Sequence, residues 1–196
     1  MRRPTRLLAF VLACACTAIV ARSQSSTAPP KPGCPEAKKL AVKVGKFANE
    51  GEVKAGAMGP NSPAMKVSGT DECRWTPGGF GLTCTYAYDV GGTKWAGTAL
   101  VYYDSTSKKY RYHGVNNLGE IEDQTGTVSG DTWTWTGESS IGGKVFHILY
   151  VTKVVSKDSY EYTESWGESE NSMEPSMSGK DTRVATSKPA TSKPAQ

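Results

Sequence analysis

The strongest constraint on the fold is a two-residue alternation of apolar and polar side chains from about residue 46 to about residue 185. Such alternation is typical of β-strands with one buried face, because successive side chains of a strand point to opposite sides. Turn-forming residues divide it into short runs. The predicted strands cover 46–55, 64–76, 80–89, 93–104, 109–116, 119–128, 131–138, 143–155, 158–166 and 177–185.

The segments between these strands are short, which predicts that each strand pairs with the next. Examples are Gly91-Gly92 and residues 129–130 and 156–159. Parallel strands would need long helical crossovers, and the series contains none. The sequence therefore predicts an all-β fold, a closed or nearly closed antiparallel meander barrel of about ten strands. Residues 35–44 are predicted to add one short N-terminal amphipathic helix, with Pro35 suited to a first helical position.

Counting residues from two of these turns predicts which residues lie opposite each other. A two-residue turn at Gly91-Gly92 and a turn at 77–80 give consistent registers, and the second places Cys73 opposite Cys84. Opposed side chains have Cβ atoms about 4.5–5.5 Å apart, which overlaps the reach of a disulfide. This pair is expected to be bonded, with Cys34 left free. The same face is expected to point inward. Its other members are Asp71, Trp75, Leu82, Tyr86, Tyr88, Trp95, Gly97, Ala99 and Val101.

The segment 131–136, DTWTWT, puts two tryptophans on one side of a predicted strand. Trp133 and Trp135 are expected to point inward, with Thr132, Thr134 and Thr136 facing water. A barrel of about ten strands encloses more space than small side chains fill. The indoles are therefore expected either to fill the interior or to line a cavity in it.

The N-terminus has the pattern of a secretory signal peptide. Arginines precede an apolar stretch, and Ala21 and Ser23 suit a cleavage site. Lipid attachment at Cys14 is a competing interpretation. The mature protein is expected to be exported, periplasmic or extracellular, and not inserted in the membrane. The predicted segments are a signal peptide at 1–23, a linker at 24–34, a β-barrel domain at 35–185 and a disordered tail at 186–196.

The charge of the mature chain argues against nucleic acid as a partner. The whole chain has 23 Lys and Arg against 19 Asp and Glu, a formal net charge of +4. Four of the arginines and none of the acids lie in residues 1–23, so the mature chain is neutral. A neutral chain gives no support to binding of nucleic acid or an anionic membrane.

Four motifs, in their order and spacing, resemble the bacterial domain-of-unknown-function family 1579. They are YYDSTSKKYRY (102–112), SGDTWTWTGE (129–138), KDSYEYT (157–163) and SGKDTR (178–183). Gly45-Lys46-Phe47 is similar to the Gly-x-Trp opening of lipocalin-like (calycin) barrels, with Phe in place of Trp. The resemblance covers about residues 35–185. It implies a lipocalin-like barrel, secreted or cytosolic, with no assigned reaction and no catalytic residues to carry over.

The candidate ligand-binding residues are aromatic and polar side chains that the alternation directs inward. They are Phe47, Asn49, Asp71, Tyr86, Tyr88, Trp95, Trp133, Trp135, Tyr162 and Glu164. The polar members have two interpretations. They either bond to tyrosine hydroxyls and water in a filled core, or form the polar floor of a ligand pocket.

The sequence contains no catalytic motif and no recognisable metal or cofactor site. His147 as an iron ligand lacks a second ligand at suitable spacing, and His113 shares a predicted exposed face with Arg111. Arg183 is a candidate for holding a ligand carboxylate, although an exposed position is more usual for arginine. No metal or cofactor is predicted.

The leading prediction is an exported barrel that binds or carries a small, partly apolar molecule. One alternative is an enzyme that uses a pocket carboxylate, Asp71 or Glu164. The other is a structural envelope protein with a filled barrel. A cavity on the inward face would favour the binding protein and the enzyme over the structural protein. Turnover of a substrate would then distinguish the enzyme from the binding protein.

Overall fold

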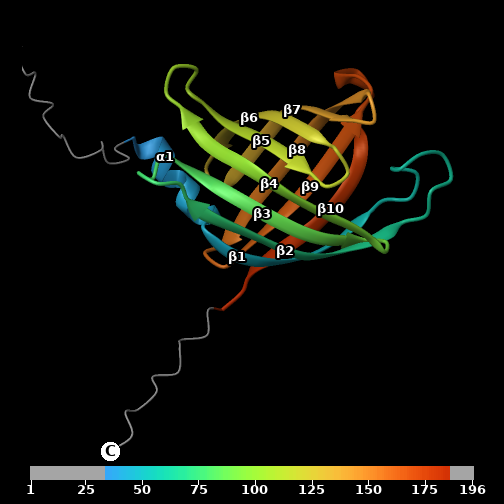
Figure 1. The fold of residues 1–196 in the computed structure, drawn as a ribbon, viewed down its shortest axis with the longest axis horizontal. Coiled ribbons are helices and arrows are strands. Elements are labelled where there is room, and N and C mark those ends of the chain that lie inside the picture. The colour runs from blue at the N-terminus through green and yellow to red at the C-terminus, as the bar shows by residue number, and fades with distance from the viewer. Residues whose placement is uncertain (1–33, 186–196) are drawn as a thin grey trace, which may run out of the picture.

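Ten strands follow one another through short turns and close into an antiparallel barrel (Figure 1). The structure, a computed structural model, describes residues 34–185. The strands are β1 (Gly45–Val53), β2 (Met65–Trp75), β3 (Gly81–Val90), β4 (Thr93–Asp104), β5 (Lys109–Asn116), β6 (Ile121–Ser129), β7 (Thr132–Ile141), β8 (Lys144–Ser156), β9 (Ser159–Gly167) and β10 (Glu174–Arg183). Each pairs with the next, and β10 pairs with β1. The predicted all-β meander is confirmed, while the predicted signal peptide and tail lie outside the described residues.

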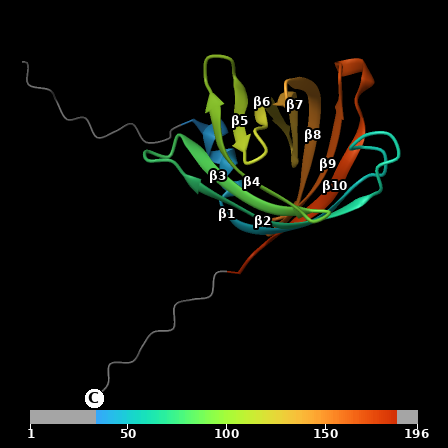
Figure 2. The same ribbon diagram turned by 45° about the vertical axis from the view of Figure 1, so that its right-hand side comes forward.

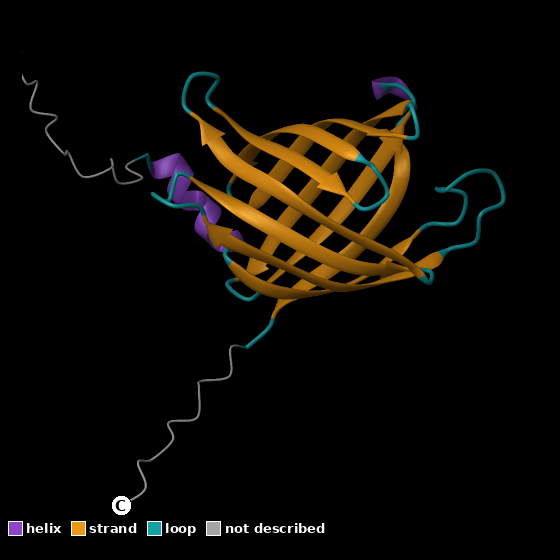
Figure 3. Cartoon of the chain, viewed as in Figure 1, coloured by secondary structure: helices purple, strands orange, loops and turns teal. Residues whose placement is uncertain are grey.

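One short helix precedes the barrel, as predicted. It begins at Pro35 as α1 (Pro35–Lys39) and tightens into the 3-10 turn η1 (Leu40–Lys43). Figure 3 shows these helical residues at one end of the barrel, here called the helical end. Figure 2 shows that the β1–β2 loop, residues 54–64, lies at the opposite end, called the loop end. In residues 34–185 no helix is long and apolar enough to cross a bilayer.

The last strand begins three residues before its predicted start at 177. Glu174 pairs with Trp166, and the register shifts between Pro175 and Met177. This irregularity breaks the alternation on which the prediction depended, because a bulge sends the following side chains to the other face. A second 3-10 turn, η2 (Glu170–Ser172), precedes β10.

The counted register of β2, β3 and β4 is confirmed. Cys73 pairs with Cys84 across β2 and β3, and the two form a disulfide. Cys34 is the free cysteine in the described part of the chain. Trp75 also lies opposite Leu82 as predicted, but its side chain is 37% exposed. It ends β2 at the rim of the barrel, where the sheet no longer covers it.

A hydrophobic core fills the helical end. Its buried members are Leu40, Cys73, Leu82, Cys84, Ala99, Val101, Tyr110, Trp133 and Trp135. Both indoles point inward as predicted, and Trp133 and Trp135 are only 2% and 3% exposed. They stack with ring centres 6.1 Å apart, and the ring of Tyr110 meets Trp133 edge-on at 4.7 Å. Leu40 of η1 is fully buried and is the one buried member of this core that comes from the helical residues and not from a strand.

Arg183 at the end of β10 fastens the helical turn to the barrel. Its guanidinium donates to the main-chain oxygens of Val44, at 2.6 Å, and Lys157, at 3.2 Å. It also pairs with the carboxylate of Asp158 at 3.2 Å and lies 4.4 Å from the ring centre of Phe47. Arg183 therefore works as a clamp at the helical end, outside the residues that line the central cavity.

Glycines on neighbouring strands make room for inward aromatic rings. A Cβ at Gly126 would lie 2.6 Å from the indole of Trp135, and a Cβ at Gly97 would lie 2.5 Å from the ring of Tyr86. Because glycine has no side chain, each ring can lie against the next strand. This arrangement keeps both rings close to the wall and leaves space at the centre of the barrel.

Candidate ligand-binding cavity

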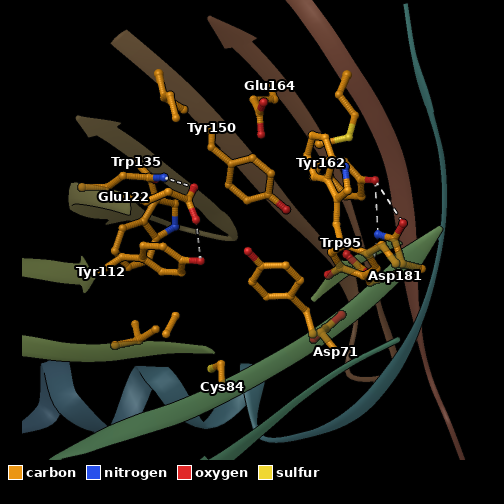
Figure 4. A pocket seen from close by; sticks show the side chains of 18 of the residues that line it. Asp71, Cys84, Trp95, Tyr112, Glu122, Trp135, Tyr150, Tyr162, Glu164 and Asp181 are labelled. Carbon is orange, nitrogen blue, oxygen red and sulfur yellow. Dashed lines mark hydrogen bonds between the residues drawn. The ribbon is translucent and has the colours of Figure 1, made fainter. Parts of the chain in front are cut away.

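A cavity of about 200 Å³ occupies the interior, and side chains from all ten strands line it (Figure 4). It lies next to the filled core of the helical end, since Trp135 and the disulfide belong to both. Eight of the ten candidate residues line it. They are Asn49, Asp71, Tyr86, Tyr88, Trp95, Trp135, Tyr162 and Glu164. The other two, Phe47 and Trp133, are buried outside the lining, beneath Arg183 and within the core of the helical end.

Two aspartates reach the cavity from the strands on either side of β1. Asn49 of β1 pairs with Asp181 of β10, and its amide donates to the Asp181 carboxylate at 2.9 Å. The Tyr162 hydroxyl donates to the Asn49 side-chain oxygen at 3.2 Å. Asp71 of β2 accepts a long bond of 3.5 Å from the Tyr160 hydroxyl. Its other oxygen, Oδ2, is buried and has no hydrogen-bond partner among residues 34–185.

Lys43 of η1 is the cation that faces these aspartates. Its ammonium lies 5.0 Å from the centre of the Tyr160 ring. Lys43 is half-buried by surface area but lines the cavity, and burial lowers the pKa of its ammonium. Burial and the neighbouring Asp181 raise the pKa of Asp71 to about 7, and burial also raises the pKa of Asp181. The aspartate pair is therefore partly protonated near neutral pH.

A second polar group is the glutamate cluster, which comprises Glu120, Glu122 and Glu164. Glu122 accepts from the Tyr112 hydroxyl and from the Gln124 amide, both at 3.1 Å. The Glu164 carboxyl has a single weak side-chain contact, from the Ser176 hydroxyl at 3.5 Å. Burial and repulsion among the three raise the pKa of Glu122 to about 7 and of Glu164 to about 8. In the described residues, no lysine, arginine or histidine forms an ion pair with this cluster.

Stacked tyrosines form much of the remaining wall. Tyr86 and Tyr88 have ring centres 5.2 Å apart, and Tyr150 and Tyr162 are 5.5 Å apart. Burial raises the pKa of Tyr162 to about 12, so its hydroxyl stays neutral at physiological pH. The cavity thus combines aromatic surface with hydroxyl and carboxyl groups that both donate and accept.

Sequence reasoning missed several lining residues. They include Lys43, Glu120, Glu122, Tyr150, Tyr160, Trp166 and Asp181. In β6 the usual polarity is reversed, because Ile121 is 58% exposed while Glu122 faces the cavity. The inward phase of Tyr160 was visible, because it alternates in step with Tyr162. Asp181 lies in the segment SGKDTR, which has no apolar residue to mark an inward face.

Neither histidine belongs to the cavity. His113 is exposed and lies 3.4 Å from Asp123 on the outer surface. His147 precedes Ile148 on β8, and Ile148 lines the cavity. Because neighbours on a strand point to opposite faces, His147 lies on the outer face. Within residues 34–185 no three His, Cys, Asp or Glu side chains gather in a way that could hold a metal ion.

Comparison with known proteins identifies the fold alone. No family model matches the sequence, and no similar sequence was found among curated proteins. Among solved structures, the crystal structure of Rv2717c from M. tuberculosis is similar, with a TM-score of 0.56 and 16% sequence identity. The match covers 78% of this chain and 99% of that chain. At this identity the likeness supports a shared barrel architecture and says nothing of a shared ligand.

Proposed function

We propose that this protein is an exported, lipocalin-like barrel that binds a small, partly apolar molecule in its central cavity. The observation that carries the proposal is the cavity of about 200 Å³ itself, lined by stacked tyrosines and by carboxyls. An apolar cavity of about 150 Å³ is large enough for benzene. The space therefore suits a ligand with one aromatic ring or a short aliphatic chain.

The polar lining supports binding over a purely structural role. A filled structural core would pair its buried polar groups, because an unpaired buried acceptor costs about 1–3 kcal/mol. Asp71 Oδ2 has no partner among the described residues, and Glu164 has one contact at 3.5 Å. Both residues belong to the cavity lining, so a ligand with hydrogen-bond donors could satisfy them.

Export and the resemblance to family 1579 are part of the same proposal. The Cys73–Cys84 disulfide is compatible with an oxidising compartment outside the cytoplasm. N-terminal sequencing of the mature protein tests export directly. A mature chain that starts near Gln24 is expected, whereas an intact Met1 or an acylated Cys14 would contradict cleavage at Ser23.

Native mass spectrometry of the protein purified from its own host tests the binding proposal. We expect a small non-covalent adduct on the wild-type chain. In Gly126→Ala, the new methyl group pushes the Trp135 indole toward the cavity, and occupancy should fall. Thr127→Ala changes an exposed neighbour on the same strand and should retain the adduct. Absence of an adduct from the wild type, or equal occupancy in Gly126→Ala, counts against a cavity ligand.

A hydrolytic or isomerising enzyme is the second candidate, and Asp71 is the observation that favours it. A carboxyl with a pKa of about 7 can both donate and accept a proton near neutral pH. If Asp71 is a catalytic residue, the wild type should convert the co-purified compound and Asp71→Asn should bind it without turnover. Unchanged conversion by Asp71→Asn rules out this role.

A further inference from the structure

Acidic groups strongly outnumber basic groups inside the barrel. Five carboxyl groups line the cavity, against one amine. The amine, Lys43, lies on the side of Asp71 and Asp181, and the electrostatic influence of both reaches it. The glutamate cluster has no ion-pair partner anywhere in residues 34–185. A buried carboxylate without a counter-charge is costly, so such a group either takes up a proton or receives a cation.

Within the glutamate cluster, Glu164 is the member that the protein itself satisfies least. Glu120 accepts from the amide of Asn116 at 2.6 Å and from the Ser139 hydroxyl, and Glu122 accepts two bonds as described above. Glu164 has only the distant Ser176 hydroxyl. Figure 4 shows its carboxyl directed into the cavity beside Tyr150. A ligand in the cavity would meet this carboxyl without displacing an existing strong hydrogen bond.

The aromatic lining has the chemistry to receive the rest of a cationic ligand. The faces of aromatic rings attract cations within about 6 Å, and the protein already places the Lys43 ammonium 5.0 Å from the Tyr160 ring. The same rings pack against apolar groups. The tyrosine pairs Tyr86–Tyr88 and Tyr150–Tyr162 supply this surface around the carboxyls.

From these observations we infer that the cavity binds a small protonated amine with an aromatic or short aliphatic group. Its ammonium is held by Glu164 and its apolar part lies among the tyrosines. This inference rests on the proposed binding function and names its ligand class. The volume of about 200 Å³ suits a molecule of on the order of ten non-hydrogen atoms, such as an arylethylamine.

An anionic ligand fits this interior poorly. Arg183 is the side chain suited to a ligand carboxylate, but its guanidinium already donates to main-chain oxygens at the helical end. The one cation of the lining, Lys43, is opposed by two aspartates. A fatty acid would therefore add a carboxylate to a cavity that already holds five carboxyl groups, and its charge would be repelled by those of them that are ionised.

The titration of the glutamates is consistent with this ligand class. Burial, and after it repulsion from neighbouring glutamates, raises the pKa of Glu122 to about 7 and that of Glu164 to about 8. A bound ammonium would lower both pKa values, because an opposite charge nearby favours the ionised carboxylate. Binding of the amine should therefore release protons to the solvent at neutral pH.

Isothermal titration calorimetry with three probes of similar size tests the inference. The probes are phenethylamine, 2-phenylethanol and 3-phenylpropionate, which present an ammonium, a hydroxyl and a carboxylate on the same aromatic frame. At about pH 7 a primary amine is fully protonated. We expect phenethylamine to bind the mature protein at least about tenfold more tightly than the other two, a difference of about 1.4 kcal/mol.

Variants on β9 identify the group that holds the ammonium. Glu164→Gln should weaken phenethylamine at least about tenfold and leave 2-phenylethanol nearly unchanged. The matched control, Glu161→Gln, alters an exposed glutamate on the same strand and should bind like the wild type. Far-UV circular dichroism and the intact disulfide verify that both variants are folded.

The outcomes separate this inference from the proposed function. If the alcohol or the acid binds as tightly as the amine, or if Glu164→Gln binds the amine normally, the ligand class is wrong while the binding function stands. If none of the three probes binds, the inference is likewise overturned. The binding function is then decided by the adduct found, or not found, in native mass spectrometry.

Discussion

Trp133 and Trp135 differ in what surrounds them, and replacing each with alanine should show it. They lie two residues apart on one strand, on the same face, and both are almost completely buried. Only Trp135 borders the cavity, whereas Trp133 is enclosed by the core of the helical end. The pair therefore compares a filled and a hollow part of the interior with the same substitution.

The expected loss in free energy of unfolding follows from the contacts that each indole makes. A buried tryptophan covers about 150–250 Å² of surface. At about 25 cal/mol per Å² this burial contributes about 4–6 kcal/mol, and the methyl group of the substituted alanine still supplies a part of it. Trp133 also makes an edge contact with Tyr110 and a stack with Trp135, so Trp133→Ala should cost about 3–5 kcal/mol. Trp135→Ala enlarges existing space, and atoms that face a void lose fewer contacts, so about 2–3 kcal/mol is expected.

Urea unfolding followed by far-UV circular dichroism measures both free energies without depending on tryptophan fluorescence. Thr136→Ala, an exposed residue on the same strand, is the control and should change the free energy of unfolding by less than about 0.5 kcal/mol. The reasoning predicts Trp133→Ala to be the more destabilised variant. Equal losses, or a larger loss for Trp135→Ala, would refute the division of the interior into a filled end and a cavity.

Three further predictions concern stability. The folded-state pKa of Glu164 is raised from 4.5 to about 8, so the folded chain binds more protons than the unfolded chain and loses stability as pH rises from about 5 to about 8. Urea unfolding should show a flatter decline of the free energy of unfolding with pH in Glu164→Gln, and a decline equal to that of the wild type would contradict the assignment. Replacing Cys73 and Cys84 together by alanine removes a crosslink spanning 11 residues and should cost about 2–3 kcal/mol, which an unaltered urea midpoint would disprove. Arg183→Gln removes charge-assisted bonds to main-chain oxygens, including that of Val44, and should cost about 1–3 kcal/mol; a thermal midpoint equal to that of the wild type would argue against the clamp.

Much of the architecture could be predicted because it depends on neighbours close in the chain. Alternation with a period of two identifies strands, and short turns restrict each strand to pairing with the next. The two glycines at 91–92 then determine the register of β3 against β4. A turn one strand earlier does the same for Cys73 and Cys84, which is why a disulfide could be predicted by counting alone.

The candidate site was predictable where large aromatic or apolar side chains marked the inward phase of a strand, and there even polar members such as Glu164, two residues after Tyr162, were found. The tryptophans and tyrosines of the lining are large apolar side chains on an inward phase, so the alternation identified most of them. Glu122 was missed because it occupies the inward phase of β6 while the apolar Ile121 faces outward. Single-strand patterns assume that apolar means buried, and a polar cavity inverts this assumption locally.

By itself, then, the sequence determined the strands, their order, the disulfide and the inward direction of Trp133 and Trp135. These features depend on local periodicity and on turns of a few residues. Only the tertiary structure decided that β10 closes against β1, which brings Asp181 beside Asn49. The same closure gathers five carboxyls from distant parts of the chain around one space. Their shared environment raises the pKa values of Asp71, Glu122 and Glu164, because burial and repulsion between carboxylates act through space and leave no periodic trace along the chain.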